Sequence, residues 1–64
     1  MKFRKVKNDE FWSKYIREDG AVSIESTERN FKPCFKVKNE LTGEVIEYCS
    51  RLKDAKAKYA DYAA

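Results

Sequence analysis

The chain has 64 residues, a formal net charge of +3, no histidine and two cysteines. This length predicts a single domain, residues 1–64, with a small core to which large aromatic side chains contribute much of the buried area. Two cysteines argue against a disulfide-rich secreted scaffold, and the sequence contains no apolar run long enough for a signal peptide or a membrane span. We therefore expect a cytoplasmic protein that has no membrane partner.

The basic residues are unevenly distributed along the chain. Four of the 14 basic residues lie within the first seven positions, so the rest of the chain carries a net charge of −1. Residues 1–7 are interpreted either as a basic arm or as an edge strand with Phe3 packed inward. Overall charge is therefore a weak argument for a polyanionic partner.

Residues 8–17 fit two alternatives. Asn8 and Asp9 can cap a helix, and the apolar residues that follow have the spacing of a short amphipathic helix. These residues are Phe11, Trp12, Tyr15 and Ile16. In the other alternative, residues 15–17 and 21–24 form a hairpin around an Asp19-Gly20 turn. The two can coexist only if the helix ends before about Lys14, and periodicity does not choose between them.

Two strands are expected in the middle of the chain. Residues 21–26 form a strand with Val22 and Ile24 facing inward, and residues 27–30 follow as a polar connection. Alternation resumes after this connection. Pro33 lies early in that pattern and indicates an edge strand or a strand start, because proline cannot donate to a ladder.

A hairpin across Thr42-Gly43 joins this strand to residues 45–49. Matching the apolar faces of the two strands fixes the predicted register. The apolar face then holds Phe31, Pro33, Phe35, Val37, Ile46 and Tyr48. The opposite face holds Lys32, Cys34, Lys36, Lys38, Val45, Glu47 and Cys49. This register pairs Glu47 with a lysine and brings Cys34 close enough to Cys49 for a cross-link.

The C-terminal residues predict an amphipathic helix that begins with Ser50 as its N-cap. Its apolar stripe consists of Leu52, Ala55, Tyr59, Tyr62 and Ala63. A helix of this length is marginal alone and needs a sheet to pack on. The expected fold is α+β, an antiparallel sheet of three strands, or four, with the C-terminal helix packed on one face.

Sequence features of catalysis are absent. The chain has no histidine, no CxxC pair and no glycine-rich phosphate-binding motif. The carboxylates are scattered, and a chain this short has little room for a cleft that buries a substrate. We expect no enzyme activity, no cofactor and no metal site.

The order of elements resembles the DNA-binding domains built from a three-stranded sheet and a helix, such as the arm-binding domains of phage-type integrases and the plant AP2 domain. Residues 15–17 with Asp19-Gly20, the Thr42-Gly43-Glu44 turn and the tail at residues 60–64 carry this likeness. In those families the sheet enters the major groove, so the resemblance implies DNA binding. Similar small proteins are common among phage accessory proteins.

A second, weaker likeness is to the double-stranded-RNA-binding domain. The second helix of that domain opens with a Lys-Lys-x-Ala-Lys pattern that contacts phosphates, and residues 53–56 match part of it. Here Leu52 stands in place of the first lysine. The resemblance implies a phosphate-binding role for Lys53 and Lys56.

Two functions are therefore expected. The first is a small nucleic-acid-binding accessory module that uses the sheet lysines together with a basic N-terminus. Its candidate binding residues are Lys2, Arg4, Lys5, Lys7, Lys32, Lys36, Lys38, Lys53 and Lys56. The alternative is a protein-interaction module, such as a phage-type modulator that docks on a host protein. The sequence does not indicate the oligomeric state.

Overall fold

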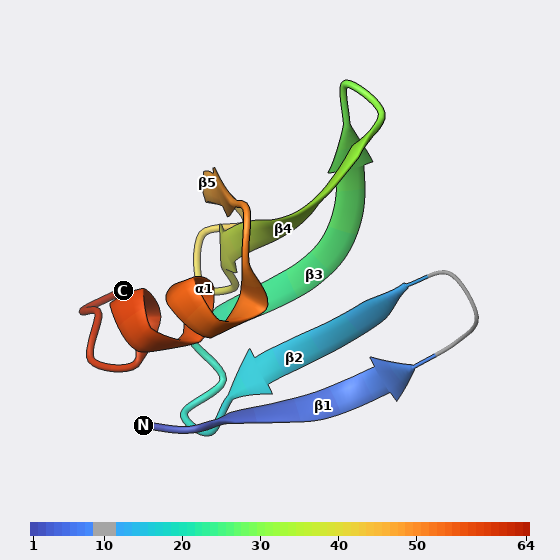
Figure 1. Cartoon of the computed structure of the whole chain (residues 1–64). Helices are drawn as coiled ribbons and strands as arrows, with labels where there is room; N and C mark the ends of the chain where they lie inside the picture. The colour runs from blue at the N-terminus through green and yellow to red at the C-terminus, as the bar shows by residue number, and fades with distance from the viewer. Residues whose placement is uncertain (9–11) are drawn as a thin grey trace.

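The computed structural model describes residues 1–8 and 12–64 (Figure 1). The predicted helix residues Asp9 and Phe11 lie outside the described residues. The elements, in chain order, are β1 (Phe3–Asn8), β2 (Ser13–Arg17), β3 (Val22–Arg29), β4 (Lys32–Asn39), β5 (Val45–Cys49) and α1 (Leu52–Tyr59).

The five strands form one antiparallel sheet in the order β1-β2-β3-β4-β5. Each strand therefore pairs with its neighbours in the sequence, and the C-terminal helix α1 packs against β3, β4 and β5 on one face. The predicted α+β class and the helix on one face are confirmed. The predicted count of three or four strands is too low because β1 and β2 both join the sheet.

The core lies between α1 and the middle of the sheet. Val22, Ile24 and Val37 are fully buried and pack with Ala55 and Tyr59 of the helix. The predicted inward positions in β3 are confirmed. Apolar side chains that pack half-buried around this cluster are Phe3, Tyr15, Phe35, Ile46, Cys49 and Leu52.

The N-terminal third is a β-hairpin. Residues 3–8 form an edge strand rather than a free arm, and the amide of Gly20 donates to the carbonyl of Arg17 (2.7 Å) in the turn that follows β2. Gly20 has a φ of 76°, which glycine adopts without the steric cost of a side chain. The helix alternative for residues 9–17 is wrong over residues 13–16, because they pair with β1 and β3 as a strand.

The hairpin between β3 and β4 is tighter than expected. Strand β3 continues to Arg29, so the prediction of a polar connection at residues 27–30 is wrong. The turn consists of Asn30 and Phe31, both with positive φ (51° and 63°). Phe31 is 96% exposed, so its predicted place on the apolar face is also wrong. Pro33 is the second residue of β4, before the pairing with β5 starts, as expected for a strand start.

The predicted register between β4 and β5 is wrong by one residue. Phe35 lies opposite Cys49 and Val37 opposite Glu47, while Lys36 lies opposite Tyr48. The register shifts between Val37 and Lys38, where β5 contributes an extra residue as in a β-bulge. Such a bulge reverses the face assignment on one side of it, so simple matching of the apolar positions fails.

Two consequences follow for the predicted contacts. Glu47 faces the helix side, and its carboxylate accepts hydrogen bonds from Lys58 Nζ (2.9 Å) instead of pairing with a lysine of β4. Cys34 precedes Phe35, the partner of Cys49, so the two cysteines lie on opposite faces of the sheet. The predicted proximity of Cys34 and Cys49 is therefore wrong, and both thiols are free.

Helix α1 begins later and ends earlier than expected. Arg51 occupies the N-cap position without a side-chain capping bond, so the prediction of Ser50 as N-cap is wrong. The helix ends at Tyr59, which leaves Tyr62 and Ala63 beyond it. The sequence is rich in alanine up to its end, and alanine gives no stop signal.

The end of α1 is held by Arg17, a residue to which the sequence analysis assigned no role. Its side chain is only 2% exposed. Nη1 of Arg17 donates to the carbonyls of Tyr59 (2.8 Å) and Tyr62 (2.6 Å), and Nε and Nη2 donate to the carboxylate of Asp19 (2.8 and 2.6 Å). Arg17 therefore satisfies carbonyls that a helix C-terminus leaves without a partner.

Candidate nucleic-acid interface

The sheet has one face that no helix covers. Ile24 and Val37 face α1, so the residues next to them in the strands face the opposite way. We call this opposite side the outer face. On the pair β3 and β4 it carries four basic side chains, which we call the outer basic face: Arg29, Lys32, Lys36 and Lys38.

Aromatic packing orders one end of the outer basic face. The guanidinium carbon of Arg29 lies 4.2 Å from the centre of the Tyr48 ring, a cation–π contact between β3 and β5. This contact requires Tyr48 on the outer face, where the observed register puts it opposite Lys36. Arg29 is absent from the predicted binding residues because the sequence pattern predicts a loop at residues 27–30, whereas β3 continues to Arg29.

Glu25 lies opposite Lys36 in the β3–β4 register, and both Glu25 and Glu40 form ion pairs with Lys14. Its Nζ lies 3.9 Å from Glu25 and 3.5 Å from Glu40, and Glu40 also accepts a hydrogen bond from the buried Ser23 hydroxyl (3.1 Å). Among the described residues, Lys36 and Lys38 have no ion pair within 4 Å. Both side chains are half-buried, and a lysine in this situation typically packs its stem on the surface and keeps its charge in water.

The helix-side lysines form a separate cluster on the other face. Nζ of Lys56 lies 4.6 Å from the centre of the Tyr15 ring, and Nζ of Lys5 lies 5.7 Å from the same ring. Lys53 is three residues before Lys56 and so lies on the same side of the helix. These three lysines therefore do not share a surface with Lys36.

The remaining N-terminal candidates are dispersed around β1. Lys2 lines an open cavity of about 410 Å³ between β1 and α1, together with Phe3 and Lys56. Nζ of Lys7 lies 4.3 Å from the centre of the Trp12 ring.

Arg4 and Lys7 of β1 lie on the outer face, because they are opposite Ile16 and Lys14 of β2. Strands β2 and β3 separate both from the lysines of β4. The expected union of the basic N-terminus with Lys36 and Lys38 is therefore not found.

Two ionisable groups near Glu47, the half-buried Cys49 and the buried Tyr59, have raised pKa values. Burial, together with a hydrogen bond to Glu47, raises the pKa of the Cys49 thiol to about 11. Burial likewise raises the pKa of Tyr59 to about 12. A thiol with a raised pKa is a poor nucleophile at neutral pH because the thiolate is the reactive form.

No family model, no curated protein and no solved structure matches the chain. Within residues 1–8 and 12–64, no three His, Cys, Asp or Glu side chains are grouped so that they could hold a metal ion. The only helix found in that part of the chain has 8 residues and is too short to cross a membrane.

Proposed function

We propose that this protein is a small, non-catalytic nucleic-acid-binding module and that its outer basic face contacts phosphates. The observation that carries the proposal is the row Lys32, Lys36 and Lys38 on an uncovered sheet face, with the nearby acids Glu25 and Glu40 drawn towards Lys14. Lysines that are not held in ion pairs can neutralise phosphates, and the counterions released from the nucleic acid favour binding.

The spacing of these lysines suits a regular polyanion. Alternate residues of a strand are about 6.6 Å apart, since each residue rises about 3.3 Å. One strand of duplex DNA carries a phosphate every ~3.4 Å along the helix axis. Lys36 and Lys38 are therefore close enough to each other for both to contact phosphates of the same strand.

A second candidate function is protein interaction through the free edge of β1. This strand pairs only with β2, and its outer edge has no strand partner among the described residues. Val6 of this strand is an exposed apolar side chain. An open edge can accept an added strand from a partner protein. We rank this function second because the charged side chains of β1 discourage edge pairing.

Binding to labelled oligonucleotides at several salt concentrations tests the first function. The probes are duplex DNA, duplex RNA and single-stranded DNA, measured by fluorescence anisotropy. The wild-type protein is expected to bind at low salt, with log K falling linearly as log salt rises. The double substitution Lys36→Gln/Lys38→Gln should weaken binding and reduce the slope by roughly 0.7–0.9 for each phosphate contact that is lost.

The matched control is Lys2→Gln/Lys53→Gln, which removes the same charge from two exposed lysines away from the outer basic face. This control should retain most of the affinity and the salt slope. An equal loss in both double variants would indicate attraction by net charge alone, and would contradict a defined face. No binding of the wild type to any probe would remove the nucleic-acid function and favour the protein-interaction one.

A further inference from the structure

The tip of the β3–β4 hairpin has an unusual residue at its centre. Asn30 and Phe31 both have positive φ, as in the two-residue turns that favour Asn followed by Gly. Asn30 fits this preference, but a bulky residue with positive φ is a steric outlier. The Phe31 side chain is 96% exposed, so packing does not offset this strain within the chain.

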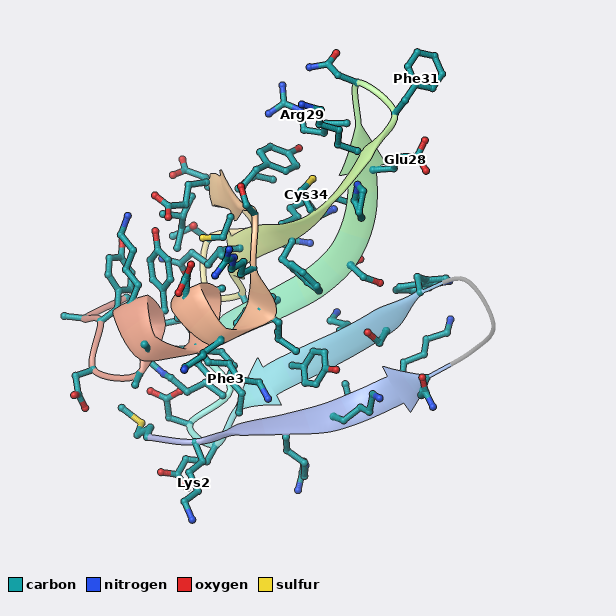
Figure 2. The ribbon with its side chains drawn as sticks, in the orientation of Figure 1. Lys2, Phe3, Glu28, Arg29, Phe31 and Cys34 are labelled. Carbon is teal, nitrogen blue, oxygen red and sulfur yellow. The ribbon has the colours of Figure 1, made fainter. Side chains whose placement is uncertain are left out.

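The tip extends away from the rest of the sheet. Pairing between β2 and β3 reaches only as far as Glu25, and pairing between β4 and β5 starts only at Phe35. The residues between these points form a ribbon of two strands, which Figure 1 shows curving away from β2. Figure 2 shows the Phe31 ring pointing outward from the end of this ribbon.

The charges around the tip are arranged by side. Arg29 and Lys32 are paired across the ribbon on the outer face, directly below the turn. Glu28 pairs with Pro33 and lies on the opposite face, as Figure 2 shows for Glu28 and Arg29. Two cations therefore lie directly before and after the turn on the outer face, while Figure 2 shows the Phe31 ring on the same side of the ribbon as Glu28.

We propose that Phe31 stacks on an exposed nucleobase while Arg29 and Lys32 contact the adjoining phosphates. This inference rests on the proposed function and identifies the part of the nucleic acid that the tip reads. Aromatic rings that stand in a basic surface bind bases of any sequence through their π-faces. The exposed base can come from a single strand or from an opened step of a duplex, into which apolar side chains can insert.

The surroundings of Phe31 favour a base over an apolar protein pocket. A ring that docks on a protein is usually the centre of an apolar patch with a polar rim. Here the sequence neighbours are Asn30 and Lys32, and the ribbon below carries Arg29 and Glu28. A single exposed ring with polar and charged neighbours, two of them cations, fits the alternation of bases and phosphates in a nucleic acid.

The test is the substitution Phe31→Gly, for which stability and affinity should move in opposite directions. Glycine adopts the turn conformation without strain, so the thermal midpoint should rise. Affinity for single-stranded DNA should fall by roughly 5- to 150-fold, the range for loss of one base–aromatic stack. The salt slope should stay unchanged because no phosphate contact is removed.

Two further variants and a spectroscopic probe sharpen this test. Phe31→Trp should retain affinity, and Leu41→Ala, which changes an exposed apolar residue in a different turn, should bind as the wild type does. An oligonucleotide containing 2-aminopurine should lose fluorescence on binding wild type but not Phe31→Gly. Probes with an unpaired base in a duplex, and fully paired duplexes, distinguish the two sources of the base.

The outcomes separate this inference from the proposed function. Wild-type binding together with an unchanged affinity of Phe31→Gly for every probe would overturn the role of Phe31 and leave the outer basic face intact. A fall in salt slope for Phe31→Gly would show that the tip acts through phosphates, and would also overturn base stacking. Failure of the wild type to bind any probe would overturn both proposals.

Discussion

Arg17 connects three parts of the chain that are distant in the sequence. Its guanidinium joins the end of β2 to Asp19 in the next turn and to the carbonyls of Tyr59 and Tyr62 at the end of α1. Arginine suits this position because its planar fork presents several fixed donors and always carries its charge. Substitution of Arg17 should therefore loosen the contact between α1 and the N-terminal hairpin.

We predict that Arg17→Met lowers the free energy of unfolding by about 1.5–3 kcal/mol or more. This range is that of one hydrogen bond to a charged group, and the substitution removes two bonds to buried or half-buried carbonyls. Urea denaturation of the purified protein measures the change. The control is Arg4→Met on β1, an exposed arginine that has no ion pair within residues 1–8 and 12–64, and it should alter stability by less than about 0.5 kcal/mol. Equal stability of the two variants would contradict the capping role.

The Asp19 carboxylate makes stability depend on pH in the acid range. The hydrogen bond from Arg17 lowers the pKa of Asp19 to about 2. The carboxylate therefore binds protons more weakly in the folded protein than in the unfolded chain, where its pKa is about 3.9. Its stabilising contribution is complete above that unfolded value and is lost as the pH falls towards 2.

We expect Asp19→Asn to remove this part of the pH dependence. Thermal midpoints of wild type and variant, measured from pH 6 down to pH 2, should differ most at pH 6 and converge at the acid end. A difference that grows as the pH falls would contradict the sign of this linkage. Glu44→Gln provides a control, because Glu44 is an exposed carboxylate in another turn.

At the scale of elements, alternation of apolar residues located the strands better than it located their faces. The inward positions of β3 follow from the period and could be predicted, whereas turn chemistry gives the hairpin around Asp19-Gly20 only as one of two alternatives. The face of β5 could not be predicted, because one extra residue at a bulge reverses it and alternation does not show where a bulge lies. The β3–β4 turn was missed because Phe31 was counted as an apolar strand residue.

The candidate binding surface, too, could be predicted from the sequence only in part. Lys32, Lys36 and Lys38 share a face because alternate residues of a strand do so, and the sequence alone predicts this. Arg29 joins them only through the position of the turn, which follows from the backbone conformation of Asn30 and Phe31. The separation of the N-terminal lysines from this face depends on strand order, which local patterns do not determine.

The β4–β5 register leads to a prediction about oxidation. Cys34 and Cys49 lie on opposite faces, and a disulfide requires Cβ atoms within about 4.5 Å and suitably directed. Oxidation of the dilute native protein should therefore give no intramolecular disulfide, as seen by non-reducing mass spectrometry. Oxidation in urea, where the chain is flexible, should give the bridge and serves as the positive control. Rapid formation of the bridge under native conditions would contradict the observed register.

At the scale of the whole molecule, a chain of 64 residues covers a five-stranded sheet with a helix of only 8 residues. The helix shields one face at the middle of the sheet, which leaves the outer face and the hairpin tip uncovered. Because the chain and its helix are short, only a few of the described side chains are fully buried in the core. Stability of a domain this small is about 3–10 kcal/mol, so each buried side chain contributes a substantial share of it.

Two valines on neighbouring strands test this division between core and surface by the same chemical change. Val37 in β4 is 0% exposed and packs on α1, whereas Val45 in β5 is 45% exposed. Val37→Ala should reduce the free energy of unfolding by about 1.5–3 kcal/mol, the value of a fully buried valine side chain. At ~4–8 °C for each kcal/mol in a domain of this size, the melting midpoint should fall by at least about 6 °C. Val45→Ala should change it by less than about 4 °C, since surface substitutions stay within about 0.5 kcal/mol. Circular dichroism melts of the two variants measure both shifts, and equal shifts would mean that β4 and β5 are packed differently from the arrangement described.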